Sequence, residues 1–175
     1  MVRLKDIAVR AGVSIMTVSK ALRDAPDVSA ATKARVKALA DQMGYVPDSS
    51  AQGLRTRSTK VLGLIVPTIT SPVYARLVLA IEERTYELGY DLLYAHTLNL
   101  IQREEHSIRR MLARRVEGMF VCPVHRLQPE ARVYQELLAR RVPVVLLGQS
   151  APFCGQFPSV AGDDEEGSCE ATRHL

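Results

Sequence analysis

The sequence lacks the features that mark exported, membrane-bound or metal-binding proteins. Its three cysteines, Cys122, Cys154 and Cys169, are odd in number and fit no spacing typical of a metal site or a disulfide framework. The N-terminus has no long apolar core of the kind found in signal peptides, and no apolar run is long enough to cross a bilayer. We therefore expect a reduced, cytoplasmic protein that has no membrane partner.

Enzymatic signatures are missing as well. The apolar run 61–66 carries a single glycine, Gly63, so it is followed by neither a dinucleotide-binding G-x-G-x-x-G nor a P-loop. The four histidines are scattered, with no fixed spacing from a cysteine or a carboxylate pair. The acidic run 163–166 suggests a divalent cation, but it precedes a helical pattern, where carboxylates complement the positive end of the helix dipole. We expect no catalytic residue, no cofactor and no metal.

Glutamate is absent from residues 1–60 and lysine is absent from residues 61–175. Residues 1–60 contain five Lys and six Arg against five Asp and no Glu, a net charge of +6. Residues 61–175 contain twelve Arg and no Lys against three Asp and eleven Glu, a net charge of −2. A basic segment joined to a mildly acidic one is typical of a protein whose basic end meets a polyanion. A solvated basic surface explains the charge equally well.

Three short helices are predicted within residues 1–47. Apolar residues at steps of three and four mark the first helix, namely Leu4, Ile7, Ala8 and Ala11. Gly12 ends it, and Ser14 then caps a second helix from Ile15 to about Arg23. Ser29 caps a third helix, from Ala30 to Met43. Two short helices joined by a tight glycine-containing turn are typical of the helix-turn-helix motif.

The second helix carries the candidate DNA-reading side chains. With its N-terminal end in the major groove, its outer side chains meet base edges and phosphates. Thr17 and Ser19 are short donors suited to phosphate oxygens, and Lys20 reaches guanine or phosphate. Ile15 and Met16 carry no polar group, so they read only shape and thymine methyl groups. Two alternatives stay open: Ile15 packs into the core, and Met16 is an ordinary surface methionine.

Five short motifs in this order resemble the headpiece of the LacI/GalR repressor family: Lys5-Asp6-Ile7-Ala8, Ala11-Gly12-Val13-Ser14, Thr17-Val18-Ser19-Lys20, Val28-Ser29 and Gly44-Tyr45-Val46-Pro47. The resemblance implies base contacts from Ile15, Met16 and Lys20. It implies phosphate contacts from a second set of residues, Thr17, Ser19, Ser29 and Thr32. It also implies a homodimer on a pseudo-palindromic double-stranded operator.

The sequence departs from the family pattern at two places. The first base-reading pair, often polar or aromatic in the family, is Ile15-Met16 here, so an operator preference does not transfer. Asp48 stands where the family usually has asparagine, which places an acid near the expected DNA.

Residues 48–60 are small, polar and basic, as expected of a connector. The family resemblance implies a hinge helix that folds on DNA, with Leu54 wedged into the minor groove and Gln52 and Arg55 near the backbone. Gly53 lowers helix propensity by up to ~1 kcal/mol, which suits a segment that is ordered by binding. The alternative is a mobile connector with Leu54 packed against a neighbouring domain.

From residue 61 onward, apolar strands alternate with amphipathic helices. Strands are expected at 61–66, 91–95, 119–122 and 142–147. Continuous apolar strands between helices indicate a parallel sheet covered on both faces. The predicted fold class is therefore α + α/β: a three-helix helix-turn-helix headpiece, a hinge segment, and a parallel α/β sheet lobe.

The second region also resembles the family's ligand-sensing domain, which is of the periplasmic-binding-protein type with two lobes around a small molecule. Residues 61–162 correspond to the first lobe and residues 163–175 to the start of the second, so we expect a fragment or a truncated product. Tyr74 falls in the family's ligand-facing loop; the alternative is an aromatic ring packed on the following helix. The resemblance implies a sugar-like or nucleobase-like effector if the second lobe is present, but Gly148 replaces the family's frequent acid.

The sequence as a whole predicts a sequence-specific DNA-binding transcription regulator, a repressor that binds its operator as a dimer. It is not expected to be an enzyme. The alternative hypothesis is a small-molecule binding module whose headpiece is non-functional.

Overall fold

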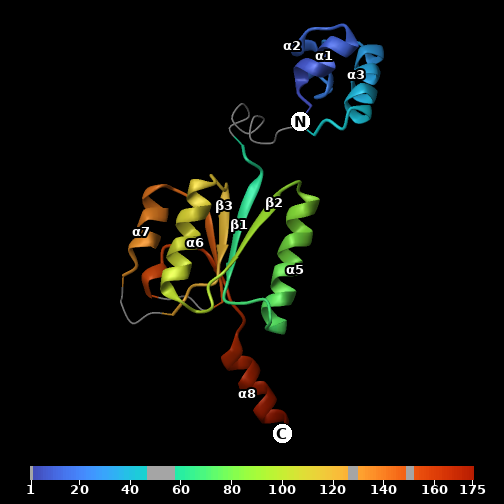
Figure 1. The fold of residues 1–175 in the computed structure, drawn as a ribbon. Helices are drawn as coiled ribbons and strands as arrows, with labels where there is room; N and C mark the ends of the chain where they lie inside the picture. Colours follow the sequence, from blue (N-terminus) through green and yellow to red (C-terminus); the bar gives the residue numbers. More distant parts are fainter. Residues whose placement is uncertain (1, 47–57, 126–129, 149–151) are drawn as a thin grey trace. The chain divides into compact units, whose positions relative to one another are not determined.

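The computed structural model describes residues 2–46, 58–125, 130–148 and 152–175. The chain divides into two compact units, which we call unit 1, residues 1–49, and unit 2, residues 50–175. Unit 1 is helical, and unit 2 is built on a sheet (Figure 1).

Unit 1 contains the three expected helices, α1 (Leu4–Ala11), α2 (Ile15–Ala21) and α3 (Ala30–Gln42). Four of its seven fully packed core residues are alanines: the set is Ile7, Ala8, Ala11, Val18, Ala21, Val36 and Ala40. Because alanine has a short side chain, the helix backbones can approach closely around a small core. The predicted miniature helical domain is confirmed.

The turn between α1 and α2 depends on a glycine. Gly12 has φ 66° in the left-handed region, and its N–H donates to carbonyl groups in the last turn of α1. A residue with a Cβ is strained in this conformation, so glycine is the natural choice for the turn. The helix that follows ends at Ala21, two residues earlier than the sequence pattern suggested.

Unit 2 contains a five-stranded sheet in which every pairing is parallel. The strands are β1 (Val61–Val66), β2 (Asp91–His96), β3 (Gly118–Val121), β4 (Val144–Leu147) and β5 (Ser159–Val160), in the order β2-β1-β3-β4-β5. The four strands expected from the sequence are present, with shifts of one or two residues at their ends. The fifth, two-residue strand was not expected.

Helices cover both faces of this sheet (Figure 1). Helix α5 (Pro72–Glu87) packs on one face, while α6 (Ile101–Ala113) and α7 (Arg132–Ala139) lie on the other. Alternation along β1 explains the two cores, because Leu64 faces the α5 side and Ile65 faces the α6 and α7 side. This arrangement confirms the predicted α/β layer architecture.

The last described helix, α8 (Asp164–His174), buries none of its residues. The Asp163 side chain caps it, since its Oδ1 accepts a hydrogen bond from the Glu166 N–H at 2.9 Å. The acidic run therefore lies at the start of a helix, as the sequence suggested. In the part of the chain that the structure describes, no helix is both long and apolar enough to span a bilayer.

Candidate nucleic-acid interface

The outer face of α2 presents two large apolar side chains to solvent. Ile15 is 48% exposed and Met16 is 65% exposed, whereas Val18 and Ala21 on the opposite side are buried. Ile15 does not belong to the core cluster of unit 1, so the alternative that it packs inside is wrong. Ile15 is the first residue of α2. Two adjacent apolar groups are thus free to contact a partner.

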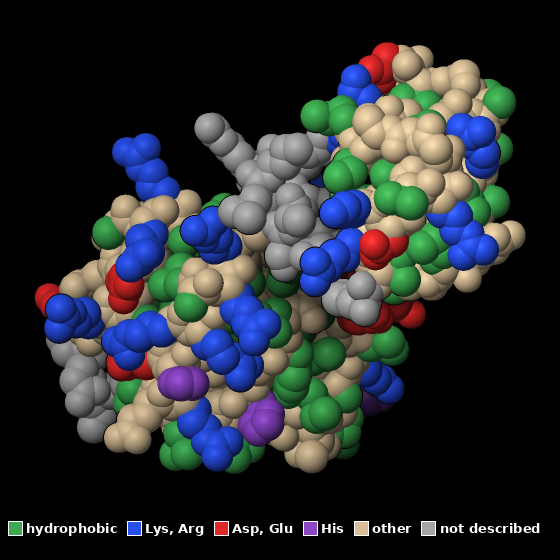
Figure 2. Space-filling model, turned by 45° about the horizontal axis from the view of Figure 1, so that its top comes forward, with side chains coloured by type: hydrophobic (Ala, Val, Ile, Leu, Met, Phe, Trp, Pro, Cys, Tyr) green, Lys and Arg blue, Asp and Glu red, His purple; other side chains and the backbone are tan. Residues whose placement is uncertain are grey.

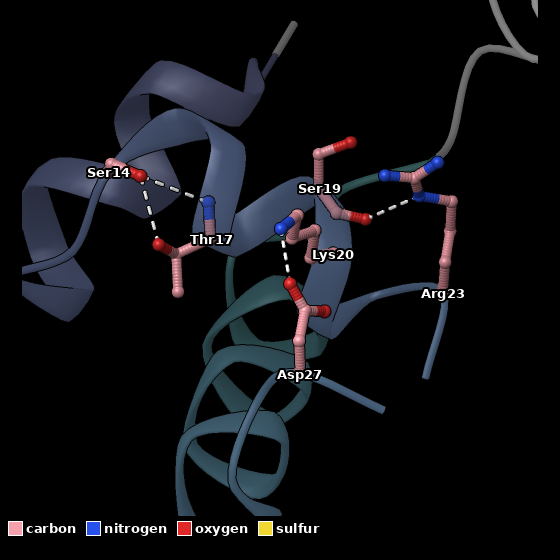
Figure 3. Close-up of polar contacts among 6 residues, drawn as sticks. All are labelled: Ser14, Thr17, Ser19, Lys20, Arg23 and Asp27. Atoms are coloured by element: carbon pink, nitrogen blue, oxygen red, sulfur yellow. Dashed lines mark hydrogen bonds and ion pairs between the residues drawn. The ribbon is translucent and has the colours of Figure 1, made fainter. Parts of the chain in front are cut away.

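A pair of hydroxyl groups organises the start of α2 (Figure 3). Ser14 Oγ accepts a hydrogen bond from the Thr17 N–H at 3.0 Å and lies 2.9 Å from Thr17 Oγ1. Thr17 is half-buried rather than fully exposed, because its side chain turns back toward this cap. A hydroxyl can make more than one hydrogen bond, so Thr17 keeps capacity for a phosphate oxygen.

The C-terminal part of α2 is held by two further contacts (Figure 3). Lys20 Nζ forms an ion pair with Asp27 Oδ2, which comes from the segment between α2 and α3. Arg23 Nε donates to the Ser19 carbonyl oxygen at 2.8 Å. The hydrogen bond from Lys20 is the largest of the effects that hold the pKa of Asp27 below its usual value. The ammonium group of a predicted base-reading residue therefore has an internal partner.

The start of α3 repeats the hydroxyl arrangement of α2. Ser29 Oγ accepts from the Thr32 N–H at 3.3 Å and lies 2.9 Å from Thr32 Oγ1. Both hydroxyls sit at the N-terminus of a 13-residue helix, where the helix dipole favours a negatively charged group. Capping and phosphate contact are compatible, since a hydroxyl accepts and donates at once.

Three predicted DNA-contacting residues, Gln52, Leu54 and Arg55, lie outside the described residues, as does Asp48. The hinge helix and the minor-groove wedge therefore stay predictions. The headpiece residues, by contrast, are brought together on α2 and at the start of α3.

Two residues that contact α2, Arg23 and Asp27, were not among the site residues predicted from the sequence. Arg23 is exposed and anchored to α2 through Ser19, and its spacing of four residues is a signal that could have found it. Asp27 is seven residues from Lys20 across a turn, and no helical periodicity connects them.

The structure places Tyr74 in the first turn of α5, not in a loop. Pro72 is the first residue of α5, and proline at this position is a sequence signal for a helix start before Tyr74. The ring is partly buried against residues at the carboxyl ends of the central strands, including Val66, Cys122 and Leu147. Burial raises the pKa of Tyr74, with a smaller contribution from Cys122, and burial raises the pKa of the Cys122 thiol to about 12.

A separate groove of about 420 Å³ lies between β2 and α6, and Tyr74 does not line it. Its polar lining includes Arg103, His106 and Arg110 from α6 and His96 from β2. Figure 2 shows histidine side chains beside basic ones on unit 2. Among the residues that the structure describes, no group of three or more His, Cys, Asp or Glu side chains is placed to hold a metal ion.

Two family profiles cover most of the chain. The family described as "Bacterial regulatory proteins, lacI family" matches residues 3–48. The family described as "Periplasmic binding proteins and sugar binding domain of LacI family" matches residues 59–175.

Comparisons with individual proteins agree with these family matches. The HTH-type transcriptional regulator GalR of Salmonella typhimurium (strain SL1344) is 31% identical over 176 residues, covering 100% of this chain and 50% of that protein. The ribose operon repressor of Escherichia coli (strain K12) is 30% identical over 175 residues, covering 100% of this chain and 52% of that protein. A crystal structure of the lac repressor dimer bound to operator and the anti-inducer ONPF matches with a TM-score of 0.81 and 26% identity, covering 99% of this chain and 52% of that one.

The chain spans about half the length of the curated relatives it matches. The matched relatives are transcription regulators by name, and the structural match extends over both units of this chain. With one family profile on each unit, the chain belongs to the LacI family of bacterial regulatory proteins.

Proposed function

We propose that this chain acts as a sequence-specific DNA-binding transcription repressor that recognises a pseudo-palindromic operator as a homodimer in the cytoplasm. Unit 1 supplies the sequence-specific contacts, and no enzymatic step is involved. The operator-bound lac repressor dimer among the similar structures supports this proposal.

The single observation that carries the proposal is the outer face of α2. A short helix with an ordered serine cap presents Ile15 and Met16 to solvent while its opposite side is locked in the core. In a helix-turn-helix protein this is the helix that enters the major groove with its N-terminal residues at the base edges. The apolar pair suits thymine methyl groups, and Lys20 suits guanine.

The remaining site residues take supporting roles in the proposal. Thr17, Ser19, Ser29 and Thr32 contact phosphates, which fix the register of the headpiece without reading sequence. Residues 48–60 act as a hinge in which Gln52 and Arg55 lie near the backbone and Leu54 enters the minor groove. The net charge of +6 on residues 1–60 favours all of these contacts.

We further propose that residues 61–162 form one lobe of an effector-binding domain and that residues 163–175 begin a second. The effector is a sugar-like or nucleobase-like molecule held at the carboxyl ends of the strands, near Tyr74. The sugar-binding description of the matching family supports this choice of ligand class. A binding module with a non-functional headpiece is not favoured, because unit 1 has a complete core and both serine caps.

A selection from a random duplex pool tests the proposal. The full chain should enrich a two-fold symmetric sequence, and its affinity for that duplex should fall steeply with salt as bound phosphates exchange with counterions. Met16→Ala should alter the enriched sequence. The matched control is Val9→Ala, which removes an apolar side chain that is 77% exposed on α1 and should leave the preference unchanged. A folded chain that enriches no duplex would contradict the proposal.

A further inference from the structure

We propose that Asp27 is a specificity-determining residue of the DNA-binding surface. Its carboxylate holds the Lys20 ammonium group on α2 and thereby weakens binding to duplexes that offer Lys20 only a phosphate. The inference rests on the function proposed above, since it concerns how the same surface separates its operator from other DNA.

The geometry that supports it lies at the C-terminal end of α2. Lys20 Nζ donates to Asp27 Oδ2, and the close-up view shows the carboxylate directly beside the ammonium group (Figure 3). The side chains are 39% and 53% exposed, so a duplex at this face reaches both groups. The Asp27 carboxyl is ionised at neutral pH like any exposed aspartate, and the hydrogen bond from Lys20 lowers its pKa further.

Phosphate oxygens carry a negative charge and guanine O6 and N7 do not. The Asp27 carboxylate, which is itself negative, therefore repels the first kind of acceptor. A phosphate that takes Lys20 away from Asp27 brings one anion toward another, and the carboxylate then lacks its counterion. An ammonium group has three donors, so Lys20 can keep Asp27 beside either acceptor, but guanine O6 and N7 carry no formal charge and bring no second anion toward the carboxylate. Asp27 therefore weakens the contacts of Lys20 with phosphates more than its contacts with bases.

The expected size of the effect is modest. A surface ion pair of this exposure changes an equilibrium by about fivefold at most. A factor of that size does not create recognition, but it multiplies the preference set by the base contacts. Asp27 would thus adjust discrimination rather than decide whether DNA binds.

The same segment offers a matched control. Lys37 Nζ lies 2.7 Å from both carboxylate oxygens of Asp24, and Lys37 is on α3 rather than on α2. Asp24→Asn and Asp27→Asn change the net charge equally, and each releases one lysine. Only Asp27→Asn releases a lysine on the face that is proposed to read bases.

The experiment uses the full chain, the duplex enriched from a random pool, and a scrambled duplex of the same composition. The ratio of the two Kd values measures discrimination. In Asp27→Asn this ratio should fall about two- to fivefold, mainly through tighter binding to the scrambled duplex. The salt dependence on the scrambled duplex should also steepen by about one counterion. In Asp24→Asn both duplexes should gain affinity equally, which leaves the ratio unchanged.

A double-mutant cycle tests whether the effect of Asp27→Asn on discrimination acts through Lys20. In a Lys20→Gln background, Asp27→Asn should no longer change the ratio, because the ammonium group that Asp27 restrains is absent. An unchanged ratio in Asp27→Asn, an equal fall in Asp24→Asn, or a full effect without Lys20 would overturn the inference while the proposed function stands. A wild-type chain that does not discriminate between the duplexes would overturn the proposed function itself.

Discussion

Unit 1 and unit 2 reach stability in different ways. The core of unit 1 is small and rich in alanine, and two of its helices, α2 and α3, begin at serine caps whose partners are three residues away. The core of unit 2 joins segments distant in sequence: buried Glu104 on α6 accepts hydrogen bonds from the Val124 N–H at 2.7 Å and from Tyr134 Oη at 2.9 Å. Unit 1 is specified by local signals, and unit 2 depends on contacts that form only in the assembled sheet.

This difference explains where functional side chains are found. Unit 1 needs only one side of α2 for its core, so the other side is available to a partner. Unit 2 uses both sides of its strands for packing, which leaves functional positions to the strand ends and to the surfaces of its helices.

The largest effect is expected at the centre of the unit 2 network. Tyr134 is fully buried, and its ring lies 5.3 Å from Phe153 and 5.9 Å from Phe157, centroid to centroid. Tyr134→Ala should destabilise unit 2 by about 3–5 kcal/mol because it leaves a cavity. Hydrogen exchange followed by mass spectrometry should show faster exchange in α6, α7 and the strands, with unit 1 unchanged.

Tyr134→Phe provides the control for this change, since it keeps the ring and removes the hydrogen bond to buried Glu104. It should cost about 1–3 kcal/mol. Equal effects of the two variants would show that the buried ring adds nothing beyond its hydrogen bond. Faster exchange in unit 1 would show that the stability of unit 1 depends on unit 2.

The next largest effect is expected in the core of unit 1. Ile7 is fully buried among alanine and valine side chains, and Ile7→Ala should cost about 2–4 kcal/mol. That is a large share of the stability of a unit this small. We expect hydrogen exchange in residues 2–46 to become fast and duplex binding to disappear, while unit 2 keeps its protection. Val9→Ala on the exposed side of α1 should leave both readouts unchanged.

A smaller effect is expected at the cap of α2. Ser14→Ala removes the acceptor for the Thr17 N–H and should cost about 1 kcal/mol, whereas Ser14→Gly should cost only a few tenths. The measurement is exchange at the first turn of α2 together with duplex affinity. Equal effects of Ser14→Ala and Ser14→Gly would show that the side-chain cap at Ser14 does not define the start of α2.

The same contrast shows what could be predicted from the sequence. Helix starts at Ser14 and Ser29 and the turn at Gly12 follow from signals within a few residues, and the parallel sheet follows from the alternation of apolar strands and helices; the structure has them all. The expected loop position of Tyr74 is wrong, because α5 begins at Pro72, while its contact with a ligand stays a prediction.

Partners far apart in the chain were beyond the reach of periodicity. The ion pair between Lys20 and Asp27 depends on how the segment after α2 folds back, and no repeat of three or four residues connects them. Glu104 and Tyr134 meet only because α6 and α7 pack side by side on one face of the sheet. Local patterns therefore predict elements and exposed faces, while the partners of individual charges require the three-dimensional structure.

The smallest effect concerns a carboxylate that joins distant segments of unit 2. Glu117 Oε1 accepts hydrogen bonds from Ser58 Oγ at 2.6 Å and from the Lys60 N–H at 2.8 Å, and these bonds, that from Ser58 foremost, lower the pKa of Glu117. A carboxyl with a lowered pKa stabilises the folded state fully above its ordinary pKa of 4.5, and this contribution is lost as the pH falls through the lower folded value. Because the carboxylate is only partly buried, solvent screening limits the effect, and we expect less than about 1 kcal/mol. Urea unfolding of unit 2 between pH 6 and pH 3 (roughly the range in which carboxyl groups titrate) should show a weaker pH dependence in Glu117→Gln than in the wild type. Identical pH profiles would mean that Glu117 does not tie the start of β1 to β3, and the long-range character of unit 2 would then rest on its buried groups alone.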